Sequence, residues 1–380
     1  MFEKKDLKWV LWIITAFLLA YFVPWEHYVV LNALKESLLL LQDYARNHVL
    51  LCLVPAFFIA GAISVFVSND AVLRYFGPMA NKLLSYSVAS VSGSVLAVCS
   101  CTVLPLFAGI YTRGAGIGPA TAFLYSGPAI NVLAIILTAK VLGLEMGLAR
   151  AIGAVGFSVI VGLLMHLIFL KEERRKLADE GERVREAPSR PLWKNATLLV
   201  AMVGFLVLVN MGFLGWWRFA WGGTFLVLVV GLSIAWMNKD EALEWFGESW
   251  FYAKLILPLL LGGVLVAGFL LGRPGHPALV PENWVIALVG GNSIRANLFA
   301  SVAGAFMYFA TLTEVPILQG LMGSGMGKGP ALSMLLAGPA VSLPSMLVLL
   351  RIMGWRKTGA YIGIVVILST LAGWLYGSLL

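Results

Sequence analysis

Two cysteines and one glutamate are the side chains in this sequence best suited to chemistry. Cys99 and Cys101 lie two residues apart in an apolar segment, and Glu314 lies in a second such segment. On a regular helix, residues two apart point to different faces, so both thiols meet one ligand only where the backbone is broken. Two sulfur ligands suit a thiophilic metal or metalloid. The other interpretation is a pair of small buried core residues, because free cysteine is common in cores.

Glu314 is a functional-site candidate because a carboxylate in an apolar membrane segment is costly. It lies two residues before Pro316. A proton-coupling group or a cation ligand fits that setting. The alternatives are pairing with Arg295 or Lys328, or a position close enough to the surface to be wet.

Both segments belong to a unit that occurs twice. Shifting the sequence by 211 positions aligns residues 81–143 with 292–354 without a gap and gives 18 identities in 63 positions, mostly Gly and Pro. A repeat at a fixed offset indicates a duplicated structural unit. Cys99 and Cys101 correspond to Ala310 and Leu312, and Glu314 corresponds to Val103. The reactive groups therefore break the symmetry.

The prolines of the repeat predict broken helices. A proline inside a helix leaves the carbonyl four residues earlier without its amide partner, and at membrane depth such carbonyls must be enclosed by protein or face a water-filled cavity. We expect breaks at 101–105, 127–131, 313–316 and 338–342 to meet near the midplane around a small solute. Kinks needed only for packing are the alternative. The candidate solute-binding residues are Cys99, Cys101, Thr102, Pro105, Ser126, Gly127, Pro128, Asn131, Thr313, Glu314, Pro316, Gly338, Pro339 and Ser342.

Glycines between the breaks predict a tight turn that leads into a helix. Gly114, Gly116 and Gly118 precede Pro119, and the second copy repeats the pattern. Proline favours the first position of a helix, and a helix start offers free amides to an anion or an electron-rich atom. Asn81 and its counterpart Asn292 could instead cap helices.

Composition places this chain in a membrane. It is 60% hydrophobic and 12% charged, whereas a soluble domain has about 25% charged residues. The net charge of +8 is therefore an orientation signal for loops and not a nucleic-acid footprint. The three cysteines lie in apolar segments, so no disulfide framework is expected. No cofactor motif is present, and the expected partners are a small-molecule or metalloid solute and the lipid bilayer.

Apolar runs predict spans at 9–23, 49–67, 147–170, 195–214, 219–237, 254–271 and 361–376, with amphipathic pieces at 26–47 and 241–250 that suit the interface. A charged linker, residues 171–194, separates a first membrane half (1–170, repeat unit 81–143) from a second (195–380, repeat unit 292–354).

The positive-inside rule favours a cytoplasmic N-terminus and a cytoplasmic linker if residues 83–111 dip into the membrane and return. Lys140 and Arg150 would then lie outside, and the halves would be inverted repeats.

The segment from Val95 to Ile135, with its Cys-Ser-Cys, Pro-Leu and Gly-Pro groups, resembles the bacterial and archaeal permease family that includes the organoarsenical efflux permease ArsP. Residues 294–349 resemble that family's second half. The resemblance implies a multi-span inner-membrane permease. For arsenic-exporting members it implies that Cys99 and Cys101 hold trivalent organoarsenicals.

The sequence predicts an all-α polytopic membrane protein with two repeated halves, acting as a permease for a small solute. A channel-like permease for an unrelated solute is the nearest alternative, and a membrane-embedded thiol redox protein or a subunit of a larger complex are others.

No enzyme is expected, because His-Glu-x-x-His, Gly-x-Ser-x-Gly and paired carboxylates do not occur. No Gly-x4-Gly-Lys-Ser/Thr motif occurs either, so coupling would come from an ion gradient, a partner ATPase or downhill flow. Glu314 is the expected proton-coupling group.

Overall fold

The chain is helical throughout the part that the structure describes. The computed structural model describes residues 27–66, 81–96, 100–180, 192–210, 215–273, 288–306, 314–323 and 325–379, with a few isolated positions outside these ranges. Within them lie fifteen α-helices and one π-helix, η1, and no strands. The predicted all-α class is confirmed.

Six helices are long and apolar enough to cross a membrane. The spanning stretches are Val49–Phe66, formed by η1 (Ala45–Leu53) and α3 (Val54–Phe66), Leu144–Glu173 of α9 (Leu144–Glu180), Trp193–Asn210 of α10 (Leu192–Asn210), Trp217–Trp236 (α11), Lys239–Leu270 of α12 (Lys239–Leu271) and Trp355–Leu379 (α18). Each overlaps one predicted span. The predicted span at 9–23 lies almost wholly outside the described residues.

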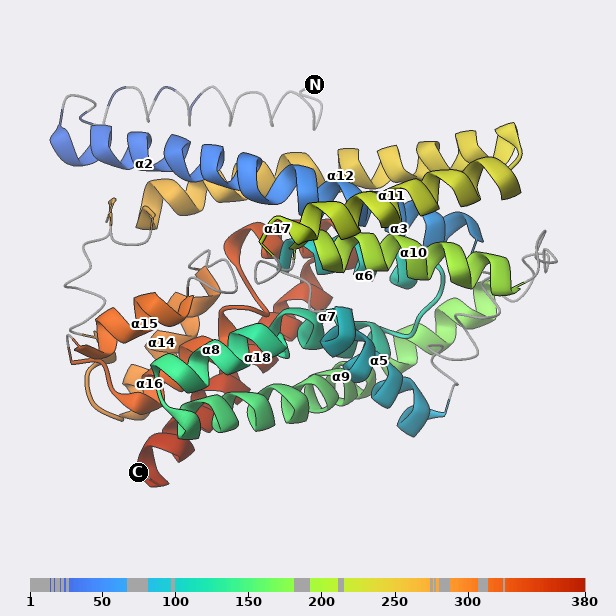
Figure 1. Cartoon of the computed structure of the whole chain (residues 1–380). Coiled ribbons are helices and arrows are strands. Elements are labelled where there is room, and N and C mark those ends of the chain that lie inside the picture. Colours follow the sequence, from blue (N-terminus) through green and yellow to red (C-terminus); the bar gives the residue numbers. More distant parts are fainter. Residues whose placement is uncertain are drawn as a thin grey trace, which may run out of the picture.

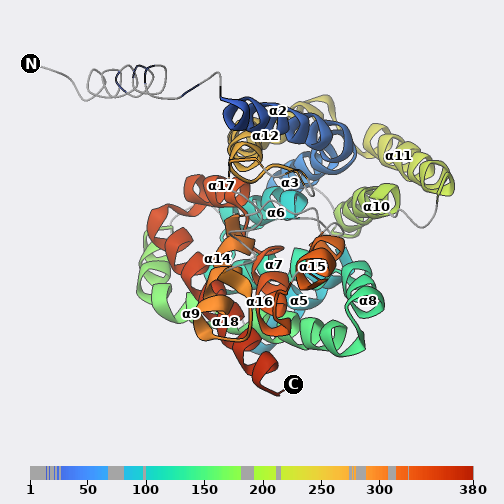
Figure 2. The same ribbon diagram turned by 90° about the vertical axis from the view of Figure 1, so that its left-hand side faces the viewer.

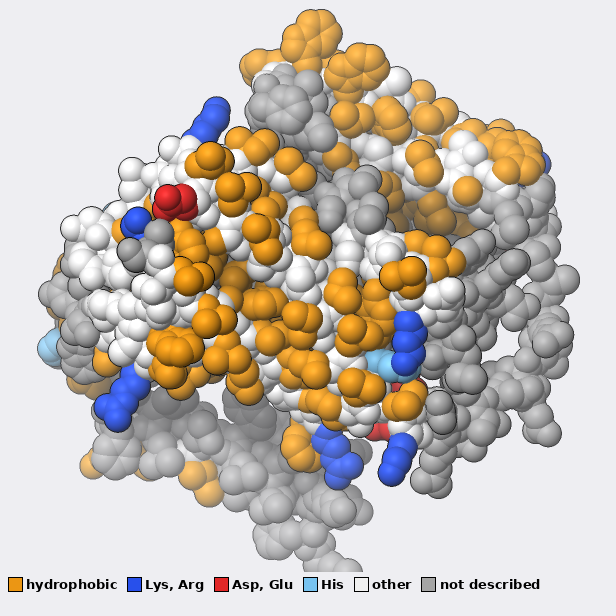
Figure 3. Space-filling view, turned by 90° about the horizontal axis from the view of Figure 1, so that it is seen from below, with side chains coloured by type: hydrophobic (Ala, Val, Ile, Leu, Met, Phe, Trp, Pro, Cys, Tyr) orange, Lys and Arg blue, Asp and Glu red, His pale blue; other side chains and the backbone are white. Residues whose placement is uncertain are grey.

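The outer surface carries a broad apolar face. Exposed side chains along α9 and α18 include Ile152, Val155, Ile367 and Leu371. Figure 3 shows hydrophobic side chains across the middle of this face, with most charged side chains towards its edges. Such a surface suits lipid and not water. The protein is a multi-pass membrane protein.

The two amphipathic pieces are continuous with neighbouring helices, and their position at the membrane interface stays a prediction. The first forms α2 (Tyr28–Tyr44), which runs directly into η1 and α3, because its C-cap residue Ala45 keeps helical φ and ψ angles of −61° and −42°. The second forms the first turns of α12. Asn238 and Glu241 cap that helix reciprocally, and it starts at Lys239, two residues before the predicted piece. The second piece therefore lies within the spanning stretch Lys239–Leu270, whereas α2 precedes the stretch Val49–Phe66.

Short helices fill the two repeat units. The first unit holds α5 (Lys82–Leu96), α6 (Ser100–Thr112), α7 (Ile117–Ala129) and α8 (Val132–Val141); the second holds α14 (Ile294–Phe306), α15 (Glu314–Gly323), α16 (Lys328–Ala337) and α17 (Leu343–Met353). Four of them, α7, α8, α16 and α17, begin and end within the described residues. At about 1.5 Å per residue, these four are too short for the roughly 30 Å of a bilayer core.

Helix boundaries recur at the sequence offset of 211. Adding 211 to 117, 132 and 144, the first residues of α7, α8 and α9, gives 328, 343 and 355, the first residues of α16, α17 and α18. Positive φ angles recur as well, at Gly114 (93°) and Gly325 (108°), and at Gly143 (103°) and Gly354 (80°). Glycine adopts these angles without the clash that a Cβ atom causes. Several shared glycines thus mark the turns.

The helices form two layers with α6 and α17 between them (Figures 1 and 2). The layer formed by α2, α3, α10, α11 and α12 lies above the other in both views. The second layer contains α5, α7, α9, α14, α16 and α18, in which α7 packs on α9 and α16 packs on α18. In Figure 1, α5 and α14 lie towards opposite ends of α9. The centre of the molecule is therefore made of repeat helices.

The charged linker begins as a helix. α9 continues to Glu180, and α10 begins at Leu192, so residues 171–180 of the predicted linker are helical, while 181–191 lie outside the described ranges. The two halves of the chain interleave in space, because α2 and α3 pack against α12.

Candidate functional site

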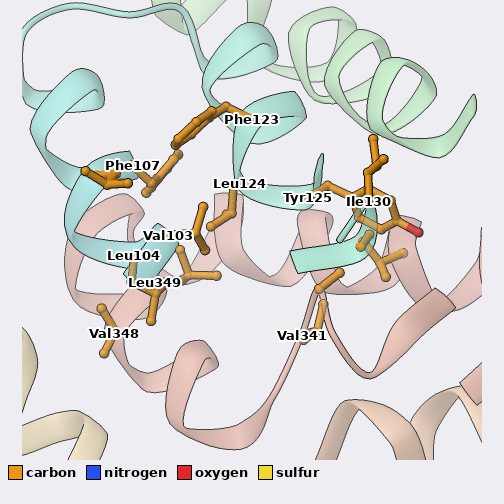
Figure 4. Close-up of a cluster of buried hydrophobic side chains, with 14 of the residues drawn as sticks. Val103, Leu104, Phe107, Phe123, Leu124, Tyr125, Ile130, Val341, Val348 and Leu349 are labelled. Atoms are coloured by element: carbon orange, nitrogen blue, oxygen red, sulfur yellow. The ribbon is translucent and has the colours of Figure 1, made fainter. Parts of the chain in front are cut away.

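The breaks after α7 and α16 lie next to each other at the centre of the protein. Tyr125 of α7 donates a hydrogen bond to the carbonyl oxygen of Leu336 in α16 at 3.1 Å, and these two residues are themselves 211 positions apart. Tyr361 of α18 donates to the carbonyl oxygen of Ala340, in the break after α16, at 3.3 Å. Figure 4 shows Ile130 and Val341, another pair of corresponding residues, in the same cluster. Segments 127–131 and 338–342 are thus brought together.

Proline explains the first of these breaks. Pro128 lies in the last turn of α7, Ile130 follows as its C-cap, and α8 begins at Val132. The axis turns by 45° between α7 and α8. Pro339 lies in the corresponding turn after α16. All the residues from Ile117 to Ala129 are buried, so packing closes this region.

The other two predicted breaks differ. Pro105 lies inside α6, which runs from Ser100 to Thr112 without interruption, so the predicted break at 101–105 is wrong. Pro316 is the third described residue of α15, and the residues before Glu314 lie outside the described ranges, so the break at 313–316 stays a prediction. Thr313 and Cys99 lie outside the described residues, as does the side chain of Cys101. Whether the two thiols meet stays a prediction.

A buried ion pair joins the two halves beside these breaks. Glu314, the first residue of α15, accepts a hydrogen bond from the Nη2 atom of Arg150 in α9. Their side chains are 2% and 0% exposed. The partner of Glu314 is therefore Arg150 and not Arg295 or Lys328. The Arg150 side chain is buried, and its predicted position on the outer side of the membrane stays a prediction.

Arg150 has one further hydrogen-bond partner, and its Nε atom donates to no described residue. Its Nη1 atom donates to Oγ1 of Thr138 in α8 at 2.8 Å, and that hydroxyl donates to the carbonyl oxygen of Ala134 at 2.7 Å. The buried Nε atom has no hydrogen-bond partner among the described residues. A buried ion pair is stable only when both charges stay paired and hydrogen-bonded, so this contact responds strongly to any change in charge.

The counterpart of this contact, at the offset of 211, is apolar. Shifting Glu314, Arg150 and Thr138 by 211 gives Val103, Tyr361 and Leu349. The helices exchange in the same way, because α15 packs on α8 and α6 packs on α17. Val103 and Leu349 are buried and belong to the cluster in Figure 4. One seam is ionic, and its counterpart is hydrophobic.

A second buried ionic cluster lies where α6, α7, α9 and α18 meet. Nζ of Lys357 lies 3.1 Å from a carboxylate oxygen of Glu172 and 3.4 Å from one of Glu173, and it donates to the hydroxyl of Tyr111 at 3.1 Å. The other oxygen of Glu173 accepts the backbone N–H of Ile117, the first residue of α7, at 3.0 Å. The helix start that the Gly-rich turn predicts to bind an anion thus binds a carboxylate of this chain.

Most remaining candidates are buried. Thr102, Ser126, Gly127, Pro128, Asn131, Gly338, Pro339 and Ser342 are all buried, whereas Pro316 is exposed. Ser126 donates to the carbonyl oxygens of Ala89 and Phe123, and the hydroxyls of Ser342 and Ser345 bond each other at 2.8 Å. These polar groups stabilise the helix ends in this closed arrangement.

The paired asparagines have different roles. Asn81 accepts from the N–H of Leu83 at 3.1 Å, which confirms the predicted helix cap at α5. Asn292 instead donates to the carbonyl oxygen of Trp374 and to the hydroxyl of Ser378 in α18. It ties α14 to α18.

Sequence reasoning missed Arg150, Thr138, Lys357 and Glu173 as site residues. A charged side chain within a long apolar helix was the available signal: Arg150 lies seven positions into α9 and Lys357 three positions into α18. The positive-inside analysis treats Arg150 as a residue near the end of a span.

The described residues contain no group of three or more His, Cys, Asp or Glu side chains that could hold a metal ion. Two hollows lie away from the helix breaks. One, of about 840 Å³, lies between α3, α10, α11 and α12, and the other, of about 510 Å³, lies along α14. Neither is lined by a predicted site residue.

Comparison with known proteins gives one consistent result. Residues 35–378 match the model of ArsP_1, described as a predicted permease. The chain is 41% identical over 370 residues to UPF0718 protein MJ0584 of Methanocaldococcus jannaschii, which covers 92% of this chain and 98% of the relative. It is 25% identical over 314 residues to UPF0718 protein YraQ of Escherichia coli, covering 81% of this chain and 72% of the relative. No solved structure matches.

Proposed function

Because the chain belongs to the ArsP_1 family of predicted permeases, we propose that it is a secondary permease in which the Arg150–Glu314 pair couples solute movement to protons. One observation carries this proposal: a fully buried ion pair joins the two halves beside the paired helix breaks. Ionisable groups at such positions in membrane proteins commonly serve proton relays and substrate pathways.

Protonation of Glu314 would change the balance of this contact. The neutral carboxylic acid no longer compensates the guanidinium charge, and an arginine does not give up its proton in a protein. Arg150 must then find water, an anionic group or a solute, and the seam between α8 and α15 opens to admit one. Loss of the proton restores the pair and closes the seam. Proton movement is thereby tied to opening.

We place the solute at the helix breaks and assign it to the class of thiophilic species, with trivalent organoarsenicals as its leading members. The support is the resemblance of the Cys99–Cys101 segment to the arsenical exporters of the family and the preference of thiolates for soft metals and metalloids. Cys101 is the second residue of α6, which packs against α7.

We further propose that the halves are inverted repeats in the cell (inner) membrane, with a cytoplasmic N-terminus and linker. The recurrence of helix starts at an offset of 211 and the opposite placement of α5 and α14 along α9 support this arrangement. Inverted repeats build many secondary transporters, whose substrate sites lie at broken helices near the midplane.

Uptake of methylarsenite into everted membrane vesicles tests the cargo and the coupling together. We expect uptake with the wild-type chain, and loss of most of it with the double variant Cys99→Ser, Cys101→Ser and with Glu314→Gln. Cys52→Ser is the matched control, because the Cys52 thiol donates a hydrogen bond to Oδ1 of Asn210 and Cys52 is not a predicted site residue. Dissipating the proton gradient should abolish accumulation.

Two outcomes would contradict the proposal in different ways. Uptake equal to that of empty vesicles rejects the arsenical cargo. Uptake that survives Glu314→Gln and gradient dissipation rejects the coupling and favours a channel. Uptake by the purified chain in liposomes would exclude a need for a partner protein.

A further inference from the structure

Both buried ionic clusters are built on α9, one near each end of its membrane span. Arg150 and Glu173 are 23 residues apart, which at 1.5 Å per residue is about 35 Å along the helix. The apolar core of a bilayer is about 30 Å thick. The two clusters therefore lie towards opposite faces of the membrane, and Glu172 in the second is 49% exposed.

Each cluster also joins the two halves of the chain. Arg150 of the first half holds Glu314 of the second, and Glu172 and Glu173 of the first half hold Lys357 of the second. Between the clusters, the contacts of α7 with α16 and of α9 with α18 include the hydrogen bond of Tyr125 to Leu336. Ion pairs thus join the two halves near both ends of α9, and helix packing joins them between these ends, around the helix breaks.

We propose that the two clusters are the two gates of this permease, which open in alternation: the Arg150–Glu314 gate at one membrane face and the Lys357–Glu172–Glu173 gate at the other. This inference rests on the proposed permease function. Movement of one half against the other about the central breaks would separate the groups at one end and keep those at the other together. The present structure, with both clusters formed, is the occluded state.

The second gate closes the end of the predicted solute path because of what Glu173 touches. Its carboxylate binds the N–H of Ile117 at the start of α7, and Lys357 holds Tyr111 near the end of α6. α6 and α7 are the elements that carry Cys101 and the first helix break. Loss of Lys357 therefore removes a contact that holds the turn between α6 and α7, at the end of α7 opposite to that break.

The two gates contain different charged groups, so a substitution can disrupt one gate and leave the other intact. One buried carboxylate faces one guanidinium in the first gate, whereas in the second an ammonium group faces two carboxylates and a phenol. Removing one partner leaves uncompensated charge, and buried charge is stable only when it is paired. Glu314→Gln should open the first gate and Lys357→Met the second.

Cysteine accessibility in the full chain measures each gate without requiring transport. In a background lacking the native cysteines, Ala134→Cys reports on the first gate, because the Ala134 carbonyl accepts from Thr138. Ala115→Cys reports on the second, because it lies in the turn between Tyr111 and Ile117. Both alanines are buried. The readout is the rate of modification by a membrane-impermeant maleimide in proteoliposomes, with the reagent added to either side.

We expect Glu314→Gln to raise labelling at 134 about tenfold or more while lowering it at 115, and Lys357→Met to do the reverse. The matched control is Glu36→Gln, which breaks a third ion pair between the halves, with Arg273, away from both gates. It should change neither rate by more than about twofold. A reciprocal change without methylarsenite uptake would support the gates and reject only the cargo.

Three results would overturn the proposal. Equal increases at both reporters in either variant would mean general loosening and not alternation. Unchanged rates would mean that the clusters hold nothing closed. Labelling of both reporters from the same side of the membrane would place the clusters at one face.

Discussion

Removing either partner of the Arg150–Glu314 pair should destabilise the protein by similar amounts at neutral pH but with different pH dependence. The relevant variants are Glu314→Gln, Arg150→Met and the double variant. Both side chains are almost fully enclosed, at 2% and 0% exposure. Water therefore does not screen the charge that remains after one partner is lost.

Glu314→Gln leaves a buried guanidinium that stays charged at every accessible pH. Breaking a buried pair in this way costs about 3–5 kcal/mol. Arg150→Met leaves a carboxylate, which escapes burial as an anion by taking a proton. At pH 7 that uptake costs about 3.7 kcal/mol for a glutamate of ordinary pKa near 4.3, at about 1.36 kcal/mol per unit. Similar losses thus have different origins.

The sign of the pH effect follows from the proton count. Folded Arg150→Met protein holds a proton on Glu314 that the unfolded chain releases at pH 7, so its stability rises as pH falls, by about 1.4 kcal/mol per unit until the unfolded glutamate also protonates. Glu314→Gln has no such group, and its deficit relative to the wild type should not recover in this way. The double variant removes both charges and should regain at least about 2 kcal/mol of the summed losses.

Thermal unfolding in mild detergent at pH 5 to 8, at one scan rate, provides the measurement. At about 2 °C per kcal/mol in a chain of this size, each single variant should unfold about 6–10 °C below the wild type at pH 7. The Arg150→Met deficit should shrink by about half at pH 5.5. Equal and pH-independent deficits, or a double variant less stable than both singles, would refute the ion-pair reasoning.

Two further predictions concern positions outside the gates. The hydrogen bond from Arg273 is the largest cause of a lowered pKa of Glu36. This pair therefore stabilises the fold above the ordinary carboxyl value of 4.5, and the stabilisation is lost as pH falls through the lowered value. Glu36→Gln should cost about 1 kcal/mol at pH 7 and less as pH falls through that range, and a cost that does not change with pH would count against it. Gly143→Ala and Gly354→Ala should each lower the free energy of unfolding by about 1–2 kcal/mol. The cause is the positive φ angle alone, since a Cβ atom at either position would meet no atom within 4 Å. Gly156→Ala is the control: it is equally open but lies within α9, so it should stabilise slightly, and a loss as large as the other two would show that backbone strain is not the cause.

The long helices were predictable because hydropathy depends on local composition. Six of the predicted spans overlap six helices, and the offset of 211 placed the turns at Gly114 and Gly325. Prolines were a weaker guide. Pro105 remains inside α6, because the cost of a missing hydrogen bond can be met by tertiary packing, and sequence spacing alone does not reveal that packing.

Pairing between distant charges was not predictable from spacing. Arg150 and Glu314 are 164 residues apart in sequence, and Lys357 and Glu173 are 184 apart. The sequence offered Arg295 and Lys328 as partners of Glu314 because they are near it in the chain. The fold instead brings α9 against α8 and α18, and α9 carries both Arg150 and Glu173.

The ionic seam and its apolar counterpart suggest why duplication alone would not suffice for coupled transport. Two identical apolar seams, each built like Val103 against Leu349, would separate at similar cost, and neither would respond to protons. In the ionic seam, Glu314 replaces Val103 and Arg150 replaces Tyr361. Opening of this seam would therefore depend on charge, whereas the apolar seam would be held by hydrophobic contacts at every pH. Under the proposed coupling, one substitution in each half converts a symmetric scaffold into one whose two seams respond differently to the same gradient. The triple variant Glu314→Val, Arg150→Tyr, Thr138→Leu rebuilds the apolar seam in both halves. It should fold and lose proton dependence, since buried ion pairs are often replaced by packed apolar residues without loss of stability.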